Sequence, residues 1–144
     1  MSADTNRKLL EQYAASQHED LSMMADDVVF TTMATGEEVV GRDALREMLH
    51  HVYHVAFDAH AEPRAMIVDD SHAVLEATIV GRHIGEFAGV SATGKDVRIP
   101  LCVVYDFRDG KIARGRVYFE IPAFLAQVGA APASNASAEN LATA

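Results

Sequence analysis

The sequence predicts an α+β domain in which helices pack on one face of a curved antiparallel sheet. Apolar residues recur with the helical period of 3.6 in the first third of the chain, and the period changes to 2 from His60 onward. Short turn signals follow at Asp69-Asp70-Ser71, Thr93-Gly94 and Asp109-Gly110, which favours antiparallel strands that pair in chain order. A sheet bent around helices encloses a space, and such spaces are frequent ligand sites.

The first part of the chain predicts two helices that flank a short pair of strands. Leu9 and Tyr13 share one helix face, as do Leu45 and Leu49 further on. β-Branched residues between the helices predict the strands. The segments are a helix over 5–18, a short helical segment over 21–25, strands over 28–32 and 38–40, and a helix over 43–55.

The second part predicts a four-stranded meander and a short closing helix. Apolar and polar residues alternate along the strands, and Pro122 stops the last one. The segments are strands over 59–68, 73–87, 97–107 and 111–121, and a helix over 123–128. Residues 1–129 are therefore predicted to form one domain. Residues 130–144 are small and polar with one Leu and cannot offset their ordering entropy, so we expect a disordered tail.

Composition excludes several classes of protein. The chain has 144 residues, a net charge of −9 and a pI near 5.1. This balance argues against nucleic acid or an anionic membrane as partner, because phosphate contacts need clustered Lys and Arg. No apolar run approaches the roughly 18 residues of a membrane span, and the N-terminus lacks a signal-peptide core. We therefore expect a soluble, cytoplasmic protein.

No metal or cofactor is expected. The lone Cys102 excludes an internal disulfide and a multi-cysteine zinc site. His50 and His54 have the i, i+4 spacing of zinc ligands, but no third ligand has a spacing that points to them. The sequence also lacks a P-loop, a dinucleotide fingerprint and a nucleophile elbow.

Strand parity leaves two interpretations open for several polar residues. His83 shares the apolar face of 73–87, where a histidine is more often structural than catalytic. Tyr13 can offer its hydroxyl to a ligand or pack as core, and Asp106 can face a pocket or water. The last strand places Tyr118 and Glu120 at even positions, which is typical of a solvated sheet face. If that face instead lined the pocket, a partly desolvated Glu120 would be a base suited to removing a proton next to a carbonyl.

Residues 81–129 carry motifs that resemble the SnoaL-like polyketide cyclases. The motifs are His-x-Gly-Glu-Phe-x-Gly at 83–89, Ala-Thr-Gly-Lys at 92–95, Phe-x-Asp-Gly-Lys-Ile at 107–112, Arg-x-Tyr-x-Glu at 116–120 and Gln-x-Gly at 127–129. The N-terminal half agrees more loosely, over 27–33 and 41–45. This group belongs to the nuclear-transport-factor-2-like superfamily, which also holds ketosteroid isomerases and limonene epoxide hydrolases. The resemblance implies a cone-shaped curved sheet wrapped around N-terminal helices, with a deep apolar pocket.

The resemblance also implies site residues. It places Glu120 in the pocket as general acid/base of an aldol ring closure, where the cyclases have Asp, and the extra methylene moves the carboxylate outward. His83 becomes a second catalytic candidate. The implied contacts to a hydrophobic ketone are Tyr13, Phe30, Thr32, Asp106 and Tyr118. The expected function is a cofactor-independent cyclase or isomerase.

Other activities of the superfamily fit less well. Epoxide hydrolases hold water with Tyr and Asn where this chain has Phe30 and Thr32, and the Arg-x-Asp pair is replaced by Arg82-His83-Ile84. Ketosteroid isomerase chemistry would cast Tyr13 and Asp106 as the oxyanion hole. A non-catalytic binding module is the competing class. We also expect a homodimer, because a convex sheet face would otherwise expose Val117 and Phe119.

Overall fold

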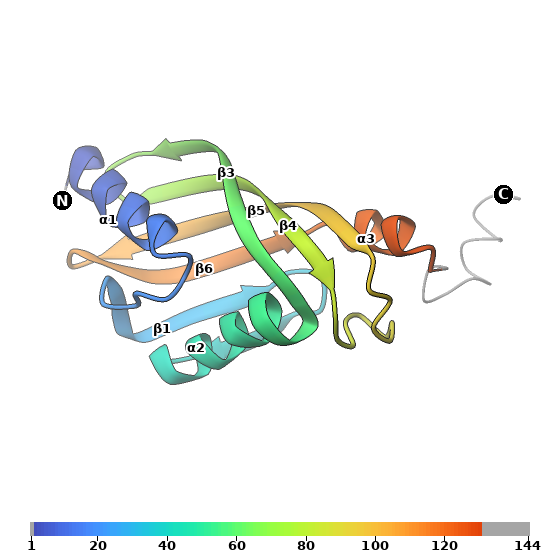
Figure 1. Cartoon of the computed structure of the whole chain (residues 1–144). Helices are drawn as coiled ribbons and strands as arrows, with labels where there is room; N and C mark the ends of the chain where they lie inside the picture. The colour runs from blue at the N-terminus through green and yellow to red at the C-terminus, as the bar shows by residue number, and fades with distance from the viewer. Residues whose placement is uncertain (1, 131–144) are drawn as a thin grey trace, which may run out of the picture.

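Helices and strands follow the predicted order in the computed structural model, which describes residues 2–130 (Figure 1). The helical elements are α1 (Ala3–Ala15), α2 (Arg42–His50), the π-helix η1 (His51–Ala56) and α3 (Ile121–Val128). The strands are β1 (Met24–Thr32), β2 (Glu37–Val40), β3 (Phe57–Val68), β4 (His72–His83), β5 (Asp96–Arg108) and β6 (Lys111–Phe119). None of the described helices is long and apolar enough to cross a membrane.

The strands form one curved sheet in the order β2-β1-β6-β5-β4-β3. The predicted meander of β3 to β6 is confirmed, with antiparallel pairing at each step. The first strand adds to it in a way that the sequence did not indicate, because β1 runs parallel to β6. This pairing places β1 beside β6, the last strand of the chain.

Helices α1 and α2 lie against the concave face of the sheet, and α3 lies at one end of it (Figure 1). α1 begins at Ser2, whose hydroxyl accepts a hydrogen bond from the Thr5 backbone N–H at 3.1 Å. α2 follows Gly41 and continues without a break into η1, where the wider turn of a π-helix carries Val52 and Tyr53. Such segments are rare and concentrate at functional sites.

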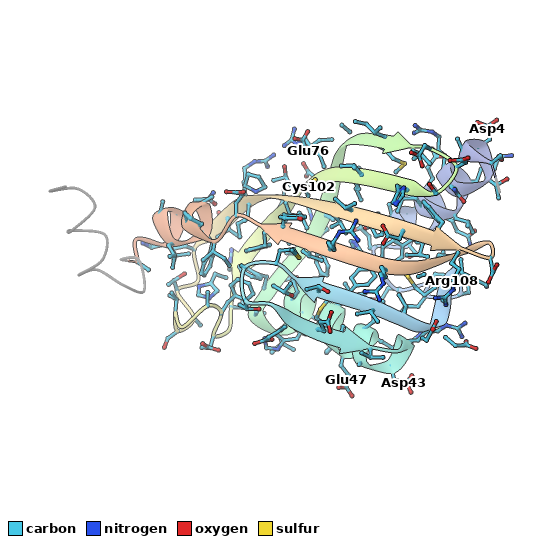
Figure 2. All side chains as sticks on the ribbon, turned by 180° about the vertical axis from the view of Figure 1, so that it is seen from behind. Asp4, Asp43, Glu47, Glu76, Cys102 and Arg108 are labelled. Carbon is cyan, nitrogen blue, oxygen red and sulfur yellow. The ribbon has the colours of Figure 1, made fainter. Side chains whose placement is uncertain are left out.

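Two apolar clusters make the core. The larger lies between the sheet and α1, α2 and η1, and includes Leu10, Leu45 and Tyr105. The smaller lies at the α3 end of the sheet around Phe57 and Phe124. The outer face of the sheet, seen in Figure 2 with β1, β5 and β6 in front, carries Glu76 and Cys102.

Some predicted boundaries change. The helical segment predicted at 21–25 is wrong, because a turn with Met24 N–H donating to the Leu21 carbonyl leads directly into β1. The strand predicted to run to Phe87 ends at His83, where the chain leaves the sheet until β5 begins at Asp96. The predicted disordered tail lies outside the described residues except for Ala130.

Candidate active site

A cavity lies between the concave face of the sheet and the α1, α2 and η1 layer. It encloses about 120 Å³ and takes walls from β1, β4, β5 and β6 as well as the helices. Most of its lining is apolar: Phe30, Met48, Leu49, Val52, Ile79, Phe87, Leu101, Val103, Val117, Phe119 and Ile121. The remaining lining residues are Tyr13, His18, Thr32, Tyr53 and Tyr105. Among the described residues, no carboxylate lines this cavity.

Three tyrosines enter the cavity from three different elements. Tyr13 comes from α1, Tyr53 from η1 and Tyr105 from β5. The rings of Tyr13 and Tyr105 meet edge to face with centroids 6.4 Å apart. Burial, with a smaller effect of the neighbouring phenols, raises the pKa of Tyr13 and of Tyr105, and burial raises that of Tyr53. All three hydroxyls therefore stay protonated and can donate hydrogen bonds.

The three phenol oxygens have no hydrogen-bond partner among the described residues. The fully enclosed side-chain polar atoms that lack a partner are Asn6 Oδ1, His18 Nδ1 and His83 Nε2. The phenol oxygens are not in that set, so they open onto the cavity that their rings line. Buried hydroxyls normally find a partner, which makes these donors available to a ligand.

His18 lies on the rim of the cavity, in the loop between α1 and β1. Its ring stacks on Tyr53 with centroids 4.7 Å apart and meets the edge of Tyr13 at 4.9 Å. Gln17 and His18 both have left-handed backbone, with φ of 53° and 67°, which costs non-glycine residues about 1–2 kcal/mol each. Burial lowers the pKa of His18 to about 4, although the nearby Gln17 carbonyl and Glu19 carboxylate oppose the shift. The imidazole is therefore neutral at pH 7.

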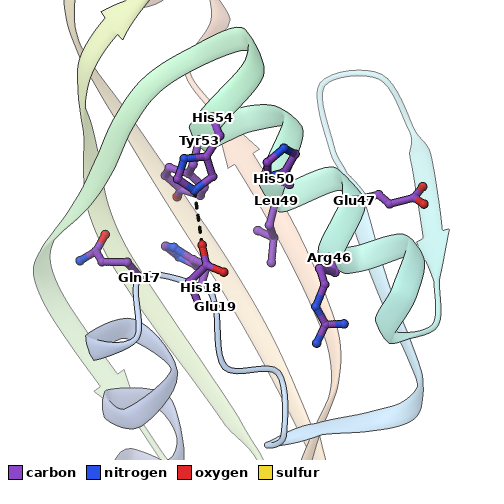
Figure 3. Close-up of a pocket in the computed structure, with 9 residues that line it drawn as sticks. All are labelled: Gln17, His18, Glu19, Arg46, Glu47, Leu49, His50, Tyr53 and His54. Atoms are coloured by element: carbon purple, nitrogen blue, oxygen red, sulfur yellow. Dashed lines mark ion pairs between the residues drawn. The ribbon is translucent and has the colours of Figure 1, made fainter.

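A cleft of about 270 Å³, lined mainly by polar and charged residues, adjoins the cavity (Figure 3). The two spaces share His18, Leu49 and Tyr53. Across the cleft, His54 Nε2 of η1 lies 3.4 Å from Glu19 Oε1 of the loop. The other lining residues are Gln17, Arg46, Glu47 and His50. The cleft thus places charged groups outside an apolar interior.

The cavity brings together three of the residues that the sequence singled out. Tyr13, Phe30 and Thr32 all line it. Phe30 is almost fully buried and packs edge to face with Tyr105, with centroids 6.1 Å apart. Their roles as substrate contacts stay predictions, but their positions allow those roles.

Glu120, Tyr118 and Asp106 lie elsewhere. Glu120 is exposed at the start of α3, and neither it nor Tyr118 lines the cavity. Asp106 lies on the outer face, where Arg116 holds its two carboxylate oxygens at 2.9 and 3.1 Å. The neighbours of Glu120, Phe119 and Ile121, line the cavity instead, so this geometry gives no support to Glu120 as a pocket residue, and its acid/base role stays a prediction. The even positions of the last strand therefore lie on a solvated sheet face, which is the interpretation that the alternation of this strand favours without the family resemblance.

His83 is fully buried but lies outside the cavity lining. Its Nδ1 accepts a hydrogen bond from the Thr93 backbone N–H at 3.3 Å and lies 3.0 Å from Thr93 Oγ1. The ring packs against Phe57 and Phe124 in the smaller cluster. His83 therefore holds the loop at Thr93 against the end of β4. Its proposed catalytic role has no support from this geometry.

Sequence reasoning missed three residues of the site. Tyr105 precedes Asp106 on the same strand. Because side chains alternate along a strand, Tyr105 points inward where Asp106 points outward, and this alternation could have identified it. Tyr53 belongs to an apolar helix stripe, a pattern that predicts a core residue. His18 gave no signal, because its position depends on two left-handed residues in a loop.

A curved sheet that encloses an apolar cavity behind a layer of helices defines the ketosteroid isomerase-like, or nuclear-transport-factor-2-like, fold. The family model for SnoaL-like polyketide cyclases matches residues 7–128. The chain belongs to this family. No curated protein matches the sequence.

Solved structures share the fold. A proposed SnoaL-like polyketide cyclase from Jannaschia sp. CCS1 has a TM-score of 0.78 at 16% identity, with 90% of this chain and 95% of that chain covered. AclR from Streptomyces galilaeus, a proposed hydroxylase, has a TM-score of 0.70 at 26% identity, covering 90% and 87%. A Catenulispora acidiphila protein of ketosteroid isomerase-like fold, solved with trimethylamine, has a TM-score of 0.71 at 17% identity, covering 86% and 94%.

Proposed function

We propose that the cavity binds a compact, hydrophobic ketone and catalyses cofactor-independent proton transfer at the carbon next to its carbonyl. Isomerisation or aldol ring closure would follow from the same enolate. The observation that carries this proposal is the set of three unpartnered phenols on an otherwise apolar cavity. The family, named for polyketide cyclases, supports the same class of substrate.

Removing a proton next to a carbonyl moves negative charge onto the carbonyl oxygen. Hydrogen-bond donors that already point at that oxygen stabilise the charge most when water is excluded. Tyr13, Tyr53 and Tyr105 provide such donors, and their raised pKa values keep the protons in place at neutral pH. An oxyanion hole made by the three phenols would not need the carboxylic acid of Asp106, which lies on the outer face of the sheet.

Size supports a small reacting group. An engineered apolar cavity of about 150 Å³ binds benzene, so about 120 Å³ suits one ring or the reacting end of a larger molecule. The cleft adds about 270 Å³ beyond His18 and Tyr53, where polar substituents could lie beside Arg46. We therefore propose a ketone whose apolar ring enters first.

Exchange of α-protons for deuterium in D₂O tests the function, because it needs no knowledge of the natural product. A panel of cyclic ketones would be followed by NMR with the wild type, Tyr13→Phe and Tyr105→Phe. We expect each loss of a donor to slow exchange by about 10²-fold. Tyr118→Phe changes the tyrosine on the outer face and is the matched comparison, with exchange expected at the wild-type rate.

Two results would contradict the proposal. Equal exchange in the wild type and both cavity variants would show that the phenols do not stabilise the enolate. Binding of ketones by the wild type without any exchange would instead favour a non-catalytic binding module.

A further inference from the structure

The cavity contains donors for a carbonyl oxygen, but a proton transfer also needs an acceptor. Among the lining residues, the only side chain with a basic atom at neutral pH is His18. Thr32 is a weak base, and the phenols keep their protons. The acceptor predicted from the family pattern, Glu120, is exposed at the start of α3.

The loop that carries His18 is firmly built. The Gln17 side chain bonds both polar atoms of the Ala61 backbone, accepting from its N–H at 3.1 Å and donating to its carbonyl at 3.4 Å. Ser16 Oγ donates to the Tyr13 carbonyl at 2.7 Å and accepts from the Asp20 N–H at 3.1 Å. These bonds hold the left-handed backbone at 17 and 18, a kind of strain that concentrates at functional sites.

The two ring nitrogens of His18 have different surroundings. Nδ1 is enclosed without a partner, whereas Nε2 is not enclosed and makes no hydrogen bond to another described residue. The ring lies between Tyr53 and Tyr13, so it is adjacent to two of the proposed carbonyl donors. A substrate carbonyl held by these phenols would have its α-carbon within the same small space.

We propose that His18 is the proton acceptor of the site and acts through Nε2; this inference rests on the proposed function. Nε2 takes the α-proton as the C–H electron pair forms the enolate double bond and the carbonyl π pair moves onto oxygen. The imidazolium then returns the proton to carbon in an isomerisation, or to the new alkoxide after the enolate carbon attacks a second carbonyl. Protons and electrons balance without a cofactor.

One nearby charge favours a transient imidazolium at His18, although burial outweighs it and keeps the pKa of the ring low. Glu19 adjoins it in the chain and favours the protonated form, while Tyr13 and Tyr53 pack against the ring as neutral groups. Arg46, Glu47, His50 and His54 line the cleft further out. The neutral form dominates at pH 7, so the acceptor is ready before substrate binds.

The test uses two variants that suit a left-handed backbone. Asn tolerates this conformation and Gly adopts it freely, so His18→Asn and His18→Gly should fold. We expect both to slow deuterium exchange by about 10²- to 10⁴-fold while ketone binding, measured by NMR titration, changes only a few-fold. Added imidazole should restore exchange in His18→Gly, in proportion to its free-base concentration, and not in His18→Asn. His60→Gln, at an exposed histidine of β3, is the matched control.

The outcomes separate the two proposals. If His18→Asn exchanges at the wild-type rate while Tyr13→Phe does not, the function stands and His18 is not the acceptor. Slow exchange with no imidazole rescue and weakened binding would assign His18 a packing role and overturn the inference. A wild type that binds ketones without exchange would overturn both proposals.

Discussion

At the scale of single residues, alternation along two neighbouring strands separates the cavity from the outer face. Val117 and Phe119 of β6 point inward, and Arg116 between its neighbours points outward to Asp106 of β5. The Asp106 carboxylate is the first cause of the raised pKa of Arg116, so the pair is held as a charged unit on the outer face. Neither group is available to the cavity.

The exposed carboxylate at the start of α3 gives a direct test of the family pattern. We expect Glu120→Gln to exchange ketone protons within about twofold of the wild-type rate, because the side chain lies outside the cavity lining. The measurement is the same NMR exchange assay. A loss of 10²-fold or more would show that the substrate-bound protein turns Glu120 inward and would restore the acid/base role implied by the resemblance.

A site residue could be predicted from the sequence when its position follows from local strand alternation, and not when it depends on a contact with a distant segment. Phe30 and Thr32 lie on a regular strand, so alternation and the family pattern place them correctly. Tyr105 could have been found by the same alternation. His18 could not, because the backbone at 17 and 18 is set by the Gln17 bonds to Ala61, forty-four residues away in the chain.

At the scale of elements, periodicity predicts the meander well and the pairing of β1 poorly. Hairpin turns bring consecutive strands together, so β3 to β6 follow from local signals. The parallel contact between β1 and β6 joins distant segments, and no turn signals it. The π-helix η1 was also predicted only as the end of a longer helix, because its apolar stripe continues that of α2.

Gly115 of β6 leaves the space in which the Phe30 ring of β1 packs at this parallel contact. It pairs with Phe30 of β1, and a Cβ at position 115 would lie 2.7 Å from the Phe30 ring. Real Cβ atoms do not approach so closely, so the ring must shift if the residue changes. Phe30 is nearly fully buried and lines the cavity, so it has little room.

We therefore expect Gly115→Ala to lower the free energy of unfolding by about 1–3 kcal/mol, as overpacking does. Urea denaturation of the wild type, Gly115→Ala, Phe30→Leu and the double variant measures it. The cost of the alanine should shrink when Leu replaces Phe30, which gives a coupling energy in the double-mutant cycle. An equal cost in both backgrounds would mean that the Phe30 contact is not its cause.

At the scale of the whole molecule, the outer face of the sheet offers one surface to a second copy of the chain. Val117 and Phe119 are not exposed on a convex face, as the sequence predicts, but line the cavity, so they give no reason for a homodimer. The outer face nevertheless presents Tyr118, 45% exposed, beside Cys102 on the neighbouring strand. Apolar groups of this kind on a sheet face favour association.

The homodimer stays a prediction with this face as its interface. We expect light scattering to give twice the 15.6 kDa chain mass, and Tyr118→Lys to shift the protein toward the monomer by placing a charge in the contact. A wild type that is monomeric at working concentration would contradict the prediction. A dimer that the lysine leaves intact would place the interface elsewhere.

The Gln17 hydrogen bonds that fix the loop after α1 also cover part of one edge of the sheet. β3 is the last strand of the sheet, and an unpaired border of this kind invites pairing with another chain. Here the Gln17 amide occupies the backbone groups of Ala61 as a neighbouring strand would, and Arg7 donates to the Met66 carbonyl at 3.3 Å. Side chains of α1 and its loop thus cover part of this border, and the Gln17 contacts that do so also hold the backbone at His18.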